Sequence, residues 1–514
     1  MATPSLAMIP SAYADSKVYS VLPNNGDGDF TFNRDSSATR VGQNGLIQEV
    51  GFFGSNIVQN GDFSDSSNWT LTTPWNIANG KANYDDTSSN AMYQTGMTIT
   101  AGKSYKITFT ISNASSTAHM TIFDYASSDL LLANENWANG TYERIFTSTN
   151  NETGISIWGN TAGNSFSIDN VSLQEVTGDQ PRLNYDISNG VVQSCPSLLL
   201  EPASTNLVTD YLGSSWATFN GASITANDST SPEGVVNATN IIYGGTANEL
   251  IQKSSITITS GVTYTISGYF KLKSGSLSSS NNDFKGLDGL NGGSIGSSTF
   301  NTINNTWKRF SFSSTSSTTS GRIQIKCEDS AEILIYGLQL EEQSYATSVI
   351  PTNGSSQTRA AETCNGAGTS STFNSTEGVL YAEISALADD NTDRRIFLSD
   401  GTMNNYVSIG YSRFTGSINA EMISGGVLQT TNFGATGVTQ SNNNKFAFSW
   451  GSGTMKFYVN GTQTNTESVT SPTGLNVLEF NTAVDTLFMY SNTRDIRVYN
   501  EALTDAQLQT LTTL

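Results

Sequence analysis

Residues 99–112, ITAGKSYKITFTIS, decide the fold, because a near-copy, ITSGVTYTISGYFK, occupies residues 258–271. Each copy reads as a strand, a turn with a glycine, and a longer strand in which apolar and polar residues alternate. One face of the first copy carries Tyr105, Ile107, Phe109 and Ile111. The matching face of the second copy carries Tyr264, Ile266 and, after a one-residue slip, Tyr269. Period-2 alternation around a short turn predicts a half-buried β-hairpin rather than a helix.

The match continues beyond these two stretches. An aromatic and basic strand follows each copy, GTYERIFT at residues 140–147 and NTWKRFSF at 305–312. Each copy then closes with a short apolar strand followed by acid, IDNVSLQE at 168–175 and IYGLQLEE at 335–342. The same order of landmarks predicts a duplicated β-sandwich. The second copy also contains a Ser, Gly and Asn tract, 274–298, which we expect to be a flexible surface loop or an extension between strands.

Composition favours several small all-β domains. A chain of 514 residues is too long for one core and should divide into about three or four domains. Only 13% of residues are charged, while 20 Tyr, 24 Phe and 7 Trp are enough for several cores. Disordered chains have the opposite composition. We therefore predict tandem β-sandwiches joined by polar turns.

Charge and cysteine content exclude several classes of function. The net charge of −20 argues against binding to nucleic acid or to anionic membranes, and it favours solubility. Three widely spaced cysteines, Cys195, Cys327 and Cys364, form neither a disulfide framework nor a zinc motif. The N-terminal residues lack the charged and apolar regions of a signal peptide, and the chain has no run of 18 apolar residues. We expect a soluble protein that no obvious signal exports.

Catalytic motifs are also missing from the sequence. The single histidine, His119, lies in an expected strand, and no nucleophile motif such as G-x-S-x-G occurs. Glycoside hydrolysis needs two carboxylates about 5–10 Å apart. The chain has no E-x-D-x-x-E strand motif, and the acids of residues 328–332, EDSAE, have a different spacing. We therefore predict that the protein is not an enzyme.

Residues 20–50 read SVLPNNGDGDFTFNRDSSATRVGQNGLIQEV, and their Asn44-Gly45 pair predicts a hairpin. This stretch resembles the start of a group of structural proteins of tailed bacteriophages, of tail-fibre or appendage type. In that group a second sequence element follows this stretch directly. In this chain the segments that correspond to it, PRLNY, CPSLLLEP and TNL, come only at 181–207. The resemblance implies that 1–50 and 179–205 form one discontinuous module that docks on the virion, with 51–178 inserted. It also implies a linker at 345–364, which contains TRAAE.

Two further resemblances concern the remaining domains. The pattern NGDF, Trp, DNVSL in the inserted domain 51–178 resembles jelly-roll carbohydrate-binding modules, and 206–344 is the second, related jelly roll. In the last domain, 365–514, KFYVNGTQ and RDIRVYNEALTDAQLQTL resemble the concanavalin A-like, laminin-G-type sandwich. Its one short C-terminal helix should begin with a capping box of Thr504 and Gln507.

Aromatic side chains are the candidates for sugar binding, because sugar rings stack on them. The candidates in the inserted domain are Trp69, Trp75, Tyr84, Tyr93, Trp137 and Trp158. Most large aromatics fill sandwich cores, and we single out Trp69, Trp75, Tyr84 and Trp137 as carbohydrate-binding residues. We expect Trp69 and Trp75 to be exposed, since polar residues surround them. The jelly-roll resemblance further implies a structural Ca²⁺ between Asp62 and Asp169, although an Asp in a turn more often only shapes the turn.

These observations favour a bacteriophage virion protein, a tail fibre or appendage, that attaches to the particle and binds a glycan or receptor on the host surface. Its partners would be other virion proteins and the host glycan, and the protein would be assembled in the host cytoplasm. Trimers are common among phage fibres, but no heptad run supports one here. Two alternatives remain open: a capsid decoration or head fibre, and a polysaccharide-active enzyme or its accessory binding subunit.

Overall fold

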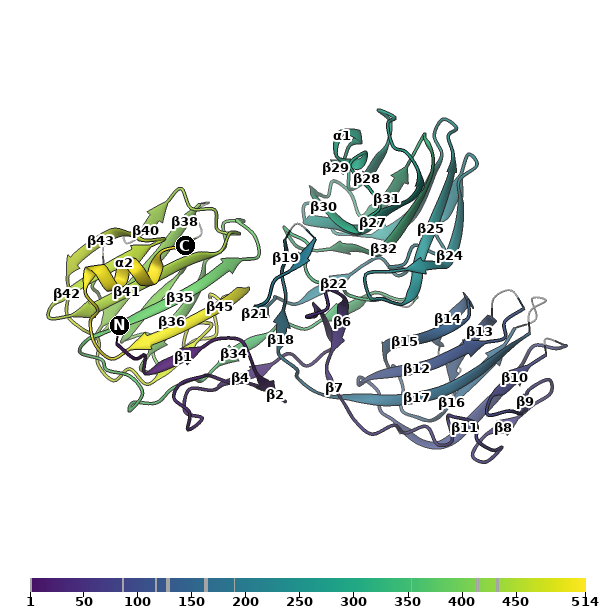
Figure 1. The fold of residues 1–514 in the computed structure, drawn as a ribbon, viewed down its shortest axis with the longest axis horizontal. Coiled ribbons are helices and arrows are strands. Elements are labelled where there is room, and N and C mark those ends of the chain that lie inside the picture. The colour runs from purple at the N-terminus through teal and green to yellow at the C-terminus, as the bar shows by residue number, and fades with distance from the viewer. Residues whose placement is uncertain are drawn as a thin grey trace.

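The computed structural model describes residues 2–85, 87–115, 118–125, 130–160, 165–188, 190–352, 354–412, 414, 416–430 and 434–514. It is an almost entirely β protein with three lobes around a central group of short strands (Figure 1). The all-β prediction of tandem sandwiches with a short C-terminal helix is confirmed. No helix within the described ranges is long and apolar enough to cross a membrane.

The first sandwich comprises strands between residues 52 and 178. Its six-stranded sheet contains β15 (Gly140–Thr147), β12 (Ser104–Ser112), β17 (Phe166–Gly178), β10 (Ala82–Tyr84) and β9 (Asn76–Ile77), with β7 (Phe52–Phe53) beside β17. Its five-stranded sheet contains β14 (Leu130–Trp137), β13 (Ala118–Asp124), β16 (Glu152–Gly159), β11 (Asn90–Ile99) and β8 (Thr70–Leu71). Apolar side chains of both sheets form one core.

The second sandwich has two five-stranded sheets. One contains β23 (Ala217–Phe219), β26 (Leu250–Thr257), β31 (Ser320–Lys326), β28 (Asp283–Asp288) and β29 (Ser294–Ile295). The other contains β24 (Ser223–Thr230), β25 (Val236–Gly244), β32 (Ser330–Glu341), β27 (Thr263–Gly275) and β30 (Lys308–Thr315). The expected flexible tract 274–298 therefore contains paired strands, followed by the short helix α1 (Ser297–Phe300). Burial of Phe284 in the core fixes β28 within this polar stretch.

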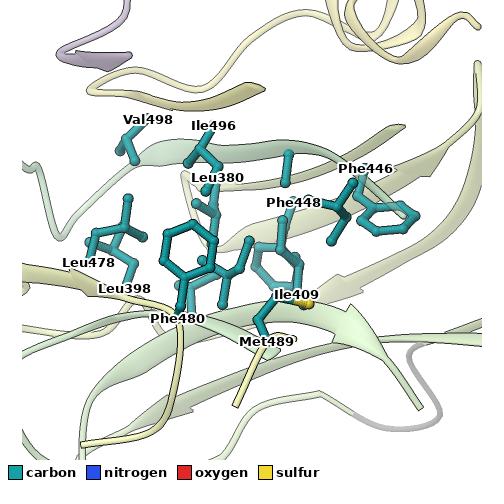
Figure 2. Close-up of a cluster of buried hydrophobic side chains, with 14 of the residues drawn as sticks. Leu380, Leu398, Ile409, Phe446, Phe448, Leu478, Phe480, Met489, Ile496 and Val498 are labelled. Carbon is teal, nitrogen blue, oxygen red and sulfur yellow. The ribbon is translucent and has the colours of Figure 1, made fainter. Parts of the chain in front are cut away.

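The third sandwich includes strands from distant parts of the chain. Its eight-stranded sheet contains β18 (Arg182–Asn184), β21 (Ser197–Leu200), β45 (Ser491–Tyr499), β35 (Gly378–Ala386), β41 (Asn444–Gly451), β42 (Thr454–Val459) and β43 (Thr462–Ser468), with β1 (Leu6–Met8) beside β45. The facing six-stranded sheet contains β39 (Val427–Leu428), β38 (Ser417–Ser424), β37 (Tyr406–Tyr411), β36 (Arg394–Ser399) and β44 (Val477–Glu479), with β40 (Gly434–Thr436) beside β38. Figure 2 shows Leu380 and Ile496 of one sheet packed toward Leu398 and Ile409 of the other.

Helix α2 (Asp505–Thr512) closes the chain and lies beside the third sandwich. The predicted capping box is confirmed, because the Gln507 N–H donates to the Thr504 hydroxyl and the Gln507 side chain accepts from the Thr504 N–H. Asn460-Gly461, a dipeptide typical of hairpin turns, forms the turn between β42 and β43.

Short strands connect the three sandwiches. They form the sheet β2 (Tyr13–Ala14), β3 (Lys17–Val18), β4 (Phe30–Asn33) and β34 (Thr363–Asn365), and the pairs β5 (Ala38–Val41) with β6 (Ile47–Val50), β19 (Ile187–Ser188) with β20 (Val191–Val192), and β22 (Ser204–Asn206) with β33 (Gln357–Arg359). Within the expected linker, 345–364, β33 and β34 pair with earlier segments. From the expected discontinuous module of 1–50 and 179–205, β1, β18 and β21 extend the third sandwich.

The prediction of a hairpin at residues 99–112 is wrong. Strand β11 pairs with β16 and β8, whereas β12 pairs with β15 and β17, so the two strands belong to opposite sheets. The second copy does the same, with β26 and β27 in different sheets. The short glycine turn thus carries the chain across the core as an arch. Alternation in the sequence set the buried face correctly but did not reveal which strand would be the partner.

A tyrosine fixes each arch in the same way. The Tyr105 hydroxyl accepts a hydrogen bond of 2.8 Å from the Thr100 N–H, and the Tyr264 hydroxyl accepts one of 2.9 Å from the Thr259 N–H. Both rings are buried. These contacts satisfy a backbone donor at the turn, where no sheet partner is present. The repeated motif therefore has a structural role in both copies.

The closing strands carry a matching bulge. The register shifts after Asp169 in β17 and after Tyr336 in β32, and the residues at the shift, Asn170 and Gly337, have φ of 53° and 66°. Between Ile266 and the buried Phe270 the alternation of β27 is regular. The expectation that Tyr269 shares this face is therefore wrong.

The opening segments of the first and second sandwiches also make equivalent hydrogen bonds. The Asn56 side-chain oxygen accepts from the N–H of Leu173 at 2.9 Å, and that of Asn206 accepts from the N–H of Leu340 at 3.2 Å. Each Asn thereby anchors the start of its sandwich to the closing strand. The duplication inferred from the sequence extends to these individual hydrogen bonds.

Candidate functional site

The four aromatic residues singled out in the sequence lie in the core of the first sandwich. The exposed fraction is 6% for Trp69, 5% for Trp75, 1% for Tyr84 and 1% for Trp137. The expectation that Trp69 and Trp75 are exposed is therefore wrong. Their indole N–H groups donate to the backbone oxygens of Asn60 (3.1 Å) and Asn90 (2.9 Å), which lets rings with polar neighbours turn inward.

Tyr84 and Trp137 are held by other rings. Tyr84 packs against Trp75 with ring centroids 5.2 Å apart, and Trp137 packs against Tyr142 at 4.8 Å. In these positions the four rings stabilise the sandwich and have no face available for a sugar.

The opening turn that carries Asp62 meets the closing strand that carries Asp169, the two residues of the calcium prediction. The Val171 N–H donates to the Gly61 oxygen at 2.9 Å. The Asp62 side chain is in an exposed turn and accepts from the Ser64 N–H, while Asp169 accepts from the adjacent Asn170 N–H. Among the described residues, no group of three or more His, Cys, Asp or Glu side chains could hold a metal ion. Two carboxylates with neighbouring carbonyls leave the calcium site a prediction.

A different set of rings is exposed on the outer face of the five-stranded sheet. Tyr93 of β11 lies opposite Ser156 of β16, and Trp158, two residues further along β16, therefore projects from the same face. Tyr125 follows β13, and its ring centroid is 5.0 Å from that of Tyr93. The exposed fraction is 41% for Tyr125 and 36% for Trp158. We call Tyr93, Tyr125 and Trp158 the aromatic face.

Polar groups border the aromatic face. Thr121 of β13 lies opposite Trp158 and is itself buried, and its hydroxyl receives a hydrogen bond of 3.1 Å from the amide of the half-buried Asn160. Flat rings beside hydroxyl and amide groups are the combination that binds sugars. The sequence identified Tyr93 and Trp158 among six candidates but missed Tyr125. Tyr93 and Trp158 each follow a buried residue, Met92 and Ile157, and this alternation indicates that the two rings face outward.

Five buried charged residues form what we call the hub: Arg34, Arg182, Glu201, Arg359 and Glu362. Arg182 pairs with both glutamates, and its Nη1 lies 2.7 Å from Glu201. Arg34 lies 2.9 Å from Glu362, and Arg359 lies 3.1 Å from Glu201. Although burial acts in the opposite direction, Arg359 and Arg182 lower the pKa of Glu201 to about 2. The hub therefore remains ionised and joins segments that are distant in the sequence.

A cavity of about 460 Å³ lies where the first sandwich, the second sandwich and the β5–β6 hairpin meet. We call it the junction pocket. The residues that determine its chemistry are Glu49, Phe53, Lys106, Glu143, Tyr211 and Glu233. Burial, together with the nearby carboxylates of Glu233 and Glu143, raises the pKa of Glu49 to about 8. Lys106 and Arg144 act in the opposite direction with a smaller effect. No signal in the sequence brought these glutamates together.

No family model matches the chain, and no curated protein matches it. Similar solved structures include the CBM40 of the Ruminococcus gnavus IT-sialidase, at 14% identity and a TM-score of 0.24 over 27% of this chain and 84% of that one. Domain 4 of the arabinanase AbnA from Geobacillus stearothermophilus has 16% identity and a TM-score of 0.25 over 30% and 73% of the two chains. The leech intramolecular trans-sialidase has 16% identity and a TM-score of 0.24 over 27% and 24%. These similarities are too weak to support a functional assignment.

Proposed function

We propose that this protein is a structural protein of a bacteriophage virion, a tail fibre or appendage, which binds a host-surface glycan through the aromatic face. The observation that carries the binding part is the exposure of Tyr125 and Trp158 beside Tyr93 on one sheet. The Tyr93 and Tyr125 rings are tilted by 37° to each other, and the exposed parts of Tyr125 and Trp158 offer apolar ring surface on which a sugar can stack. Catalysis is not part of this function.

The hub supports the virion part of the proposal. Its residues come from the segments that resemble phage structural proteins: NRDSSATRV, PRLNY, LLLEP and TRAAE. These segments meet in one buried ion-pair network rather than at an open cleft. The network joins the short segments that connect the sandwiches, which suits a rigid display protein. Weak single sites on such a protein gain avidity when many copies are displayed.

The virion part can be tested on purified phage particles. We expect mass spectrometry to detect the chain in particles, and labelled antibodies to locate it on the tail by electron microscopy. Location on the capsid would favour the alternative of a head fibre or decoration protein. Absence of the chain from purified particles would contradict the virion assignment.

Glycoside hydrolysis is a second candidate function because the pKa of Glu49 suits a general acid at neutral pH. A second carboxylate would have to act as base or nucleophile. Glu233 already accepts a hydrogen bond from Tyr336, and Glu143 lies 3.7 Å from Lys106. These contacts weigh against hydrolysis. If the protein released reducing sugar from host capsule and Glu49→Gln did not, hydrolysis would be established. Hydrolysis would then replace adhesion as the main activity.

A further inference from the structure

The junction pocket has the size and position of a ligand site. Its volume of about 460 Å³ falls within the range of about 300–1,000 Å³ that is common for small-molecule sites. Strands β6 and β7 form one wall, β12 and β15 of the first sandwich form another, and Tyr211 and Glu233 come from the second sandwich. A molecule bound there would contact three separate parts of the fold.

The charged groups of the pocket leave an excess of carboxylate. Glu49, Glu143 and Glu233 face two cations, Lys106 and Arg144. Lys106 lies 3.7 Å from Glu143 and 4.1 Å from the centre of the Phe53 ring. With every group ionised, the pocket would therefore carry one negative charge more than positive.

Both cations are already engaged by the protein. Arg144 donates to the Glu143 backbone oxygen at 2.8 Å, and its guanidinium lies 5.2 Å from the centre of the Trp137 ring. Lys106 pairs with the Glu143 side chain, as described above. Lys106 and Arg144 balance only two of the three carboxylates, so a proton or a bound ligand must neutralise the third.

Glu49 differs from Glu233 in its hydrogen bonds. Glu233 accepts from the Tyr336 hydroxyl at 2.5 Å and from the Asn237 amide at 2.7 Å. The Glu49 residue is half-buried, and its Oε2 is shielded from solvent without a hydrogen-bond partner in the part of the chain that the structure describes. A shielded carboxylate oxygen of this kind is costly unless the group is protonated or binds a donor.

We infer that the junction pocket binds the protonated amine of an unacetylated amino sugar, with Glu49 as the carboxylate that receives it. The inference rests on the proposed function in one respect, which is that the amine belongs to a glycan. On binding, Glu49 releases its proton to solvent, and the ammonium of the sugar takes its place as the counter-charge. A neutral sugar would not supply that charge, and an anionic one would meet three glutamates.

Titration calorimetry on the full chain tests this site with glucosamine, glucose and N-acetylglucosamine as probes. We expect glucosamine alone to bind. Its affinity should rise about tenfold between about pH 5.5 and about pH 6.5, because one proton leaves Glu49 per ligand below the pKa of that group. Over this range the amine of the sugar remains protonated, so the change reports on the protein.

Glu49→Gln keeps the shape of the side chain and removes its charge. We expect it to weaken glucosamine binding at least tenfold and to abolish the pH dependence, while Glu501→Gln, an equal charge change at an exposed position of the third sandwich, has no effect. Equal binding of glucose, or undiminished binding by Glu49→Gln, would overturn the inference. Trp158→Ala should leave glucosamine binding unchanged. A negative result for glycan binding at the aromatic face can therefore be told apart from a negative result for amine binding in this pocket.

Discussion

Arg182 and Glu362 are 180 residues apart in the sequence and form a buried two-point ion pair. The Arg182 Nε donates to Glu362 Oε1 at 2.8 Å, and Nη2 donates to Oε2. The remaining nitrogen of this guanidinium reaches Glu201 at 2.7 Å. All of its polar atoms are therefore directed at partners from other segments of the chain. This arrangement makes Arg182 the centre of the hub.

Removing Arg182 should strongly destabilise the protein. Arg182→Met leaves two buried carboxylates without their main partner, and loss of one member of a buried ion pair costs about 3–5 kcal/mol. We expect a drop of that size in the free energy of unfolding in urea. The matched control is Arg494→Met, which breaks the more exposed pair with Asp186 and should cost less than about 1 kcal/mol. Equal effects of the two substitutions would contradict a central role for the hub.

Acid should weaken the hub through Glu201. The pKa of this carboxyl is lowered from 4.5 to about 2 in the folded protein. A depressed carboxyl contributes stability above its unfolded pKa, and that contribution is lost as the pH falls toward the folded pKa. We therefore expect stability to decline between about pH 4.5 and about pH 2, with roughly 3 kcal/mol of the loss due to Glu201. Urea unfolding at several pH values should show a smaller decline for Glu201→Gln.

The two arch tyrosines should contribute alike to stability. Tyr105→Phe and Tyr264→Phe each leave one backbone N–H without its acceptor, at a cost of about 1–2 kcal/mol. Thermal unfolding of both variants should show similar destabilisation, whereas Tyr19→Phe, at an exposed ring, should be close to neutral. A large difference between the two arches would show that the duplicated contact is not equivalent.

Calcium, if it binds the first sandwich, should raise its stability. We expect a chelator to lower the melting temperature of the full chain and calcium to restore it. Asp169→Asn should remove this response, while Asp65→Asn, in a nearby exposed turn, should retain it. An identical melting curve with and without chelator would show that Asp62 and Asp169 hold no structural metal.

The sequence predicted the fold class because alternation identifies buried faces directly. Tyr105, Ile107, Phe109 and Ile111 are all buried as predicted. Alternation does not identify the neighbouring strand, which is why the structure has an arch at residues 100–103 where a hairpin is predicted. Strand partners depend on contacts distant in sequence, as in the pairing of Leu6 with Val498.

The candidate site was harder to predict. Exposure of a ring depends on which backbone groups lie near it, and the indole of Trp69 turns inward to a carbonyl nine residues earlier. The junction pocket brings together Glu49, Glu143 and Glu233, from three regions whose proximity only the assembled fold determines. The motif residues Arg182 and Glu362 were visible in the sequence, but their pairing was not.

Glycan binding by the aromatic face is the central claim, and a glycan array with the labelled full chain tests it most directly. We expect the wild-type protein to bind a defined group of glycans, and the double variant Tyr125→Ala/Trp158→Ala to bind them at least about tenfold more weakly, since each stacked ring contributes about 1 kcal/mol. Phe219→Ala, an equally exposed ring on the second sandwich, serves as the control and should bind as the wild type does. Undiminished glycan binding by the double variant would contradict the claim.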